Sequence, residues 1–247
     1  KEWPITDTVM TNYYLHDKLI LKNSNTYEGD GSTEYTYDSL NPVPTIGGGI
    51  SAADNFMTPV GFDQVGRKGL VGCIDNQPLI MRTDVLSFQT SELNKDIELT
   101  GPILVHLWVS SSAKDTDFTA KLIDVFPRSS DYPEGLAINI SDSIMRTRYR
   151  NSWEKPELME PGNPYLLVFS LYPTSNVFKQ GHRIRIDVSS SNWPRFDVNP
   201  NTGGKLGRKQ GHRLAHQVIF HEPQRSSHVV LPIQVSNEDE EAAQNDT

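Results

Sequence analysis

Two histidines four positions apart, His212 and His216, have the spacing of a metal-binding pair. On a helix this spacing would place both imidazoles on one face, where they could share a zinc ion as in H-E-x-x-H enzymes. The residues between them are Arg213, Leu214 and Ala215, so the glutamate base of that motif is missing. Because spacing alone often matches by chance, we predict surface or turn histidines and no metal site.

The carboxylates of Asp115, Asp117 and Asp124 could supply the oxygen ligands that calcium prefers. The D-x-D-x-D-G series of a calcium-binding loop is absent, however. We therefore expect Asp115 and Asp117 to form a turn into a strand, with their carboxylates accepting backbone N–H bonds. Cross-strand ion pairs are a further structural use, since four arginines lie on nearby predicted strands: Arg146, Arg148, Arg183 and Arg185.

The chain contains no nucleophile elbow. Serine hydrolases place their serine in a G-x-S-x-G turn between a strand and a helix. The nearest approach is Gly29-Asp30-Gly31-Ser32, without the flanking elements. The lone Cys73 is better explained as a small hydrophobic residue than as a nucleophile. Phosphate-loop and dinucleotide fingerprints are also missing, so we predict no catalytic residue, no cofactor and no hydrolysis by this chain alone.

Aromatic side chains suggest one further site. Trp193, Arg195 and Phe196 follow a predicted strand, and loops of this kind often carry binding residues. Together with Trp153, these rings could stack on a sugar. The alternative is that the rings fill the interior, which is the commoner fate of large aromatic residues.

The elements that would position these residues are short strands separated by turns. In Arg183–Ser189 the isoleucines alternate with Arg185 and Asp187, which predicts one core face and one outward face. Leu104–Val109 is apolar on both faces apart from His106, which predicts a central, doubly covered strand. The predicted strands are Val85–Phe88, Ile97–Leu99, Ile103–Ser110, Phe118–Phe126, Leu136–Ile140, Ile144–Arg150, Tyr165–Tyr172, Arg183–Ser189, Gln217–His221 and His228–Ile233.

Strand-helix-strand alternation is missing, so we predict an all-β sandwich. Residues 26–75 are rich in Gly, Ser, Asn, Pro and Thr and predict an irregular excursion with a short strand near Tyr35–Tyr37. Gly203–Ala215 could form a short helix. We divide the chain into an irregular segment with an interface loop at 1–83, the sandwich core at 84–236 and an acidic tail at 237–247, with the first two in one domain.

The composition suits a water-soluble globular protein, with 36% hydrophobic and 22% charged residues. A net charge of −8 and the lack of basic runs exclude a nucleic-acid surface. No apolar run reaches the roughly 18 residues of a membrane span, and one cysteine allows no internal disulfide. These features do not determine the cellular compartment of the protein. The opening Lys1-Glu2-Trp3-Pro4 is neither an initiator methionine nor a signal peptide, which suggests that the chain starts inside a longer product or after processing.

Several ordered motifs resemble one known family. Residues 37–48 read Y-D-S-L-N-P-V-P-T-I-G-G, close to the family's Y-D-P-x-x-P-V-P-T-x-G-G. Further matches are Phe62-Asp63-Gln64, R-T-D-V-L at 82–86, L-T-G-P at 99–102, L-W-V-S-S-S-A-K-D-T-D-F-T-A at 107–120, S-S-S-N-W-P-R-F-D-V-N-P-N-T-G at 189–203 and S-S-H-V-V-L-P-I at 226–233. The chain thus resembles the C-terminal domain of serine hydrolases of the cocaine esterase, X-Pro dipeptidyl-peptidase and glutaryl acylase family.

This resemblance implies a non-catalytic jelly-roll sandwich, akin to galactose-binding-like modules, that packs on an α/β-hydrolase domain and a helical cap. The partner domains would be in the same or a companion chain and would act on ester or amide substrates, with acyl or X-Pro dipeptidyl groups. The catalytic triad would lie upstream of this chain. The resemblance also implies that the loop after P-T-I-G-G helps to wall the acyl pocket, through Gly48, Gly49, Ile50 and Ser51.

Two alternatives remain open. The chain could be a stand-alone jelly-roll that binds a glycan or a peptide through its loop aromatics. It could also be a structural module that uses its sheet edges or faces to form a homo-oligomer. The first alternative predicts an exposed Trp193 or Trp153, whereas a hydrolase part predicts a partly apolar docking surface.

Overall fold

The computed structural model describes residues 5, 8–27, 29, 31–47, 61–205 and 211–235. Strands dominate these residues, and the helices are single 3-10 turns at Asp17–Leu19, Leu79–Met81 and Thr147–Tyr149. The strands are β1 (Thr8–His16), β2 (Ile20–Lys22), β3 (Ser32–Tyr37), β4 (Leu86–Gln89), β5 (Ile97–Ser111), β6 (Asp117–Phe126), β7 (Leu136–Arg146), β8 (Tyr165–Phe178), β9 (Arg183–Ser189), β10 (Ala215–Glu222), β11 (Arg225–Ser226) and β12 (His228–Gln234). Within the described residues, none of the helices is long and apolar enough to cross a membrane.

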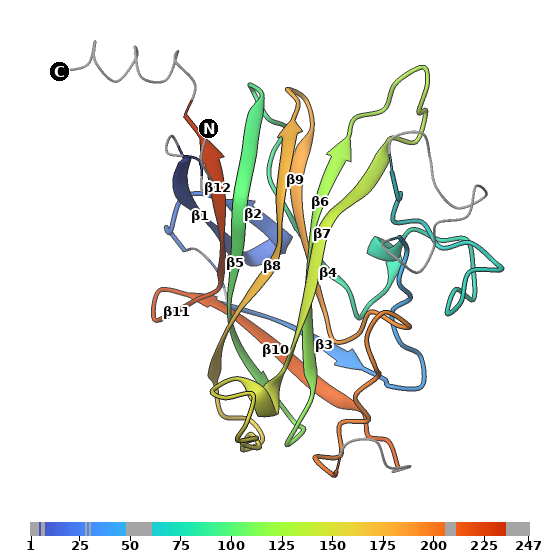
Figure 1. Cartoon of the computed structure of the whole chain (residues 1–247), viewed down its shortest axis with the longest axis vertical. Coiled ribbons are helices and arrows are strands. Elements are labelled where there is room, and N and C mark those ends of the chain that lie inside the picture. Colours follow the sequence, from blue (N-terminus) through green and yellow to red (C-terminus); the bar gives the residue numbers. More distant parts are fainter. Residues whose placement is uncertain are drawn as a thin grey trace.

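Two layers of strands enclose the core, which confirms the all-β sandwich (Figure 1). Strands β1, β3, β5, β8, β10 and β12 form one layer, and β4, β9, β6 and β7 form the other. Strand β2 joins the layers because it pairs with both β1 and β4. Alternate side chains of each layer meet in one cluster, for example Val105 and Leu107 from β5 with Leu122 from β6 and Ile186 from β9.

Strand β5 is central, as predicted: it pairs with β8 along nearly its whole length and with β12 and β10 on its other side. The burial of its two faces differs from the prediction of a doubly covered strand. Leu99, Val105 and Leu107 are fully buried, whereas Leu104, His106 and Trp108 on the opposite face are only half-buried. One face of β5 therefore packs in the core, and the other is partly open.

Two pairs of predicted strands are single strands in the structure. Ile97–Leu99 and Ile103–Ser110 join through a bulge at Gly101. Leu136–Ile140 and the start of the predicted Ile144–Arg150 are both part of β7, which ends at Arg146 and is followed by a 3-10 turn instead of further strand. Glycine and polar residues, which usually favour turns, lie within strands here because a β-bulge accommodates the extra residue without ending the strand. Of the possible helix at Gly203–Ala215, the described residues are not helical, and Ala215 begins β10.

The N-terminal segment is more regular than expected. Between residues 8 and 37 it contributes β1, β2 and β3, and β1 pairs with β12 from Thr8 to Tyr14. Its strand character depends on a partner more than 200 residues away in the sequence, which local patterns do not reveal. The boundaries at 83 and 236 stay a prediction.

Residues 38–47 and 61–85, here called the covering segment, lie over the outer face of β6, β7 and β9 (Figure 1, at the right). The segment has its own apolar cluster of Val43, Ile46, Leu70, Leu79 and Val85, with Cys73 against it. It buries Arg185 and Asp187, which were expected to face solvent. Both point away from the core, yet each is 4% exposed and they form an ion pair at 2.9 Å.

Candidate functional site

Two of the sequence motifs meet at the edge of the covering segment. The Thr45 N–H donates to the Trp193 carbonyl at 2.6 Å, and the Trp193 N–H donates to the Val43 carbonyl at 2.9 Å. The Val43 N–H also donates to Ser191 Oγ at 2.8 Å. The P-V-P-T-I-G-G motif is therefore tied, just before its glycines, to the S-S-S-N-W-P-R-F motif.

The proposed ligand-binding trio does not converge on one site. Trp193 is half-buried, and its ring lies so close to Gly72 that a Cβ there would be 2.9 Å from a ring carbon. Arg195 pairs with the buried Asp142 at 2.6 Å. Phe196 lines a surface pocket together with Trp153. Trp193 and Arg195 thus have structural contacts, and a ligand role for the trio stays a prediction.

Beneath the covering segment lies a layer of buried charged and amide side chains. Lys121 on β6 is 4% exposed, and its Nζ donates to Gln64 Oε1 at 3.2 Å. Burial lowers the pKa of Lys121, and the nearby Asp142 and Asp187 act in the opposite direction. Asn192 donates to Asp142 at 2.9 Å. These contacts hold the covering segment on the sheet through polar groups as well as through its apolar cluster.

The outer side of the covering segment exposes large apolar side chains. Ile74 and Met81 are 70% and 69% exposed, and both line a hollow of about 110 Å³ together with Pro44. Leu40 and Val71 on the same segment are also more than half exposed. Single exposed apolar side chains are common on protein surfaces, whereas contiguous apolar patches are typical of contact sites.

A second pocket, of about 230 Å³, lies at the end of β7. Trp153, 73% exposed, stacks on Tyr149 with ring centroids 5.8 Å apart, and Phe196 and Arg146 also line the pocket. The Arg146 guanidinium is fixed by two hydrogen bonds to Asp117, both of 2.9 Å. The sequence suggested Trp153 and Phe196 among the rings that could stack on a sugar, but gave no sign that Tyr149 and Arg146 would join them.

The carboxylates considered for calcium are bound to protein groups. Asp115 accepts from the Arg148 backbone N–H at 3.1 Å and from its Nε at 2.9 Å, and Asp117 pairs across strands with Arg146. Their predicted structural role is confirmed. His216 lies on a strand and bonds to Thr36 Oγ1 at 3.0 Å, so it does not form a helical pair with His212. Among the described residues no group of three or more His, Cys, Asp or Glu could hold a metal.

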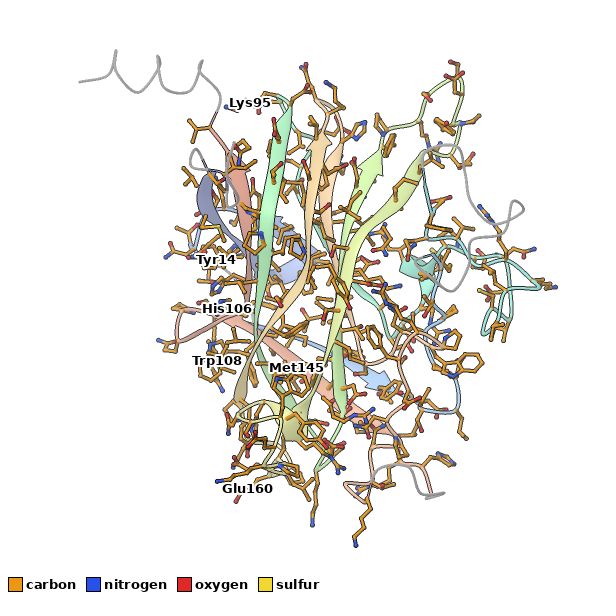
Figure 2. The ribbon with its side chains drawn as sticks, viewed as in Figure 1. Tyr14, Lys95, His106, Trp108, Met145 and Glu160 are labelled. Atoms are coloured by element: carbon orange, nitrogen blue, oxygen red, sulfur yellow. The ribbon has the colours of Figure 1, made fainter. Side chains whose placement is uncertain are left out.

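A row of rings lies on the open face of the first layer (Figure 2). His106 stacks on His228 with centroids 4.6 Å apart and planes 12° apart, and Tyr14 lies 5.2 Å from His228. Trp108 follows His106 on the same face of β5. Burial and the neighbouring His228 lower the pKa of His106.

The fold and these motifs agree with a comparison to known families. The profile of the X-Pro dipeptidyl-peptidase C-terminal non-catalytic domain matches residues 1–230. The chain belongs to this family. The X-Pro dipeptidyl-peptidase C-terminal domain is non-catalytic, in agreement with the missing nucleophile elbow.

Three relatives illustrate the match. The chain is 40% identical to cocaine esterase of Rhodococcus sp. (strain MB1 Bresler) over 243 residues, which covers 94% of this chain and 39% of that protein. A selenomethionine-labelled α-amino acid ester hydrolase has a TM-score of 0.75 at 29% identity, covering 91% of this chain and 36% of that one. An aminopeptidase from a marine sediment archaeon, Thaumarchaeota archaeon, shares the fold, with a TM-score of 0.76 at 23% identity and coverage of 95% and 38%.

The X-Pro dipeptidyl-peptidase C-terminal domain described here thus spans about two fifths of the length of the proteins it matches. The residues expected to wall an acyl pocket, Gly48 to Ser51, lie outside the described residues. Their neighbour Gly47 has a φ of +103°, and a Cβ there would lie 2.6 Å from the Phe62 ring. This close approach requires glycine at the point where the described chain breaks off.

Proposed function

We propose that this domain packs through its covering segment on the α/β-hydrolase domain and cap of a serine hydrolase. In this proposal the complete enzyme cleaves ester or amide bonds, with an acyl or X-Pro dipeptidyl group on the substrate. The loop that contains Gly48, Gly49, Ile50 and Ser51 walls the acyl pocket. The domain itself supplies no catalytic residue.

The observation that carries the proposal is the position of the exposed apolar residues. Ile74 and Met81 share a hollow with Pro44 of the P-V-P-T-I-G-G motif, so the apolar surface adjoins the start of the loop. Covering this hollow with a partner domain would remove both side chains from water, and about 25 cal/mol would be gained per Å² of apolar area. The same contact would bring the loop to the partner.

Docking can be tested with Met81→Lys in the complete natural protein that contains this chain. A charged side chain at a buried apolar contact should weaken the docking. We expect a lower melting temperature and a KM that rises at least severalfold for ester substrates. Val168→Lys is the matched control, since Val168 is 44% exposed on β8, away from the covering segment. Equal effects of the two substitutions would contradict docking through this surface.

The pocket wall can be tested with Ile50→Trp in the same protein. A larger side chain in the wall should reduce kcat/KM for esters of bulky acyl groups about tenfold more than for acetyl esters. Changing the leaving group of the ester should not alter this difference in kcat/KM. An unchanged ratio between acyl groups would show that this loop does not wall the acyl pocket.

A glycan-binding function is the second candidate, and the pocket at Trp153 favours it. An exposed indole beside the fixed guanidinium of Arg146 combines a stacking face with hydrogen-bond donors. Titration of soluble oligosaccharides, followed by tryptophan fluorescence, should then show saturable binding that Trp153→Ala abolishes. A protein that binds none of them in this pocket would contradict the glycan hypothesis.

A further inference from the structure

A cavity of about 850 Å³ lies at one end of the sandwich. Its lining comes from β1, β2, the end of β12 and the connection between β4 and β5, residues 90–96. Lys95 on this connection shows the end concerned in Figure 2. The cavity shares no described lining residue with the covering segment or with the pocket at Trp153. Its volume is in the range of about 300–1,000 Å³ that is typical of small-molecule sites.

The buried part of this lining is apolar. Leu21 is 1% exposed, and Leu93, Ile97 and Ile233 are partly buried and pack against the main core cluster. Such side chains offer dispersion contacts to a ligand but neither donate nor accept hydrogen bonds. A molecule that fills this part of the cavity therefore needs an apolar body.

The charged residues of the lining are closer to water. Four of them are exposed: Glu92, Lys95, Asp96 and Glu98. Glu92 forms an ion pair with Arg183 at 2.9 Å, and Asp96 forms one with Lys179. A charged ligand group that moved into the apolar part would leave water without meeting an opposite charge, which is costly. The lining thus disfavours both carboxylate and ammonium groups in the interior of the cavity.

One polar group of the buried lining has no partner. Tyr13 on β1 lines the cavity and is only 7% exposed. Among the described residues, none forms a hydrogen bond with its hydroxyl. Burial raises the pKa of Tyr13, so the hydroxyl keeps its proton at neutral pH and can donate it. Because buried hydroxyl groups normally have a partner, this one is available to a ligand.

We propose that this cavity binds a neutral, largely apolar molecule with one carbonyl group, a ketone or an ester, and that Tyr13 donates a hydrogen bond to the carbonyl oxygen. The carbonyl of such a molecule accepts the bond and brings no proton that would need a second partner. A purely apolar molecule would leave the buried hydroxyl unsatisfied. The inference does not rest on the proposed function, because it is argued only from the residues of this cavity.

Titration of the complete natural protein with acetophenone tests the proposal, with saturation-transfer NMR to measure Kd. Ethylbenzene is the matched ligand, since a CH₂ group replaces its carbonyl. Tyr13→Phe removes the hydroxyl and keeps the ring. We expect this variant to bind acetophenone about fivefold more weakly than the wild type, with less than a twofold change for ethylbenzene, because only the ketone loses a hydrogen bond.

Two further variants locate the binding. Leu93→Trp fills the apolar part of the cavity and should weaken both ligands at least about fivefold, since a larger side chain occupies their space. Tyr172→Phe is the matched control, because it removes the hydroxyl of a tyrosine that is 61% exposed on β8, and it should leave both Kd values unchanged.

The remaining outcomes would each overturn the inference. Without saturable binding of acetophenone, the cavity does not take this class of ligand. If neither Tyr13→Phe nor Leu93→Trp changes Kd, the ligand binds elsewhere. If Leu93→Trp alone weakens binding, the cavity takes apolar molecules without selecting a carbonyl, and the proposed ligand class is wrong.

Discussion

At the scale of single residues, three buried aspartates of the described part of the chain each pair with an arginine. Asp115 binds Arg148, Asp117 binds Arg146 and Asp142 binds Arg195. Such pairs are costly to break, because one charge is then left buried without compensation. Several of these residues were candidates for metal or ligand contacts in the sequence, and polar residue types alone did not distinguish binding from internal pairing.

The stacked histidines predict a pH dependence of stability. The folded-state pKa of His106 lies below its ordinary value, so folding favours the neutral imidazole. Its contribution to stability is therefore complete above about pH 6.5 and is lost as the pH falls through the lowered, folded-state pKa. We expect the melting temperature of the wild type to fall more steeply than that of His106→Gln between pH 7.5 and 5. A constant difference between the two over this range would contradict the prediction.

At the scale of elements, sequence patterns predicted the strands that alternate or are densely apolar, including β4, β6, β9 and β12. They did not predict that β5 is continuous, because Thr100-Gly101-Pro102 is typical of a turn. Of the candidate site, the sequence revealed the motifs but not the contacts between them. The hydrogen bonds between Val43–Thr45 and Ser191–Arg195, and the one from Gln64 to the Ile46 carbonyl, depend on pairings between separate parts of the chain, which no local pattern encodes.

The bulge in β5 gives a prediction about the stability of a single element. Gly101 has a φ of +146°, and a Cβ there would lie 2.8 Å from Pro232 Cβ of β12. Gly101→Ala should therefore lower the free energy of unfolding by about 1–3 kcal/mol through backbone strain and crowding. Chemical denaturation of the two forms measures this difference, with Gly162→Ala as control, since a Cβ at Gly162 (φ +83°) meets no atom within 4 Å. A loss no larger than that of the control would show that β12 adapts.

At the scale of the whole molecule, the domain is a sandwich with one covered and one partly open outer face. The covering segment buries the polar layer around Lys121 and presents Ile74 and Met81 outward. The family that the chain matches is described as a non-catalytic C-terminal domain. In the function that we propose, the domain has a supporting role: it provides a pocket loop and a docking surface for chemistry performed elsewhere.

The most direct test is to label the protein from its natural source with a fluorophosphonate probe and to locate the labelled serine by mass spectrometry. The probe reacts with a serine that is activated by a neighbouring base. We expect stoichiometric labelling of one serine outside these 247 residues, in the same or a companion chain. A labelled serine within these residues, or a protein in which no serine reacts, would contradict the central claim.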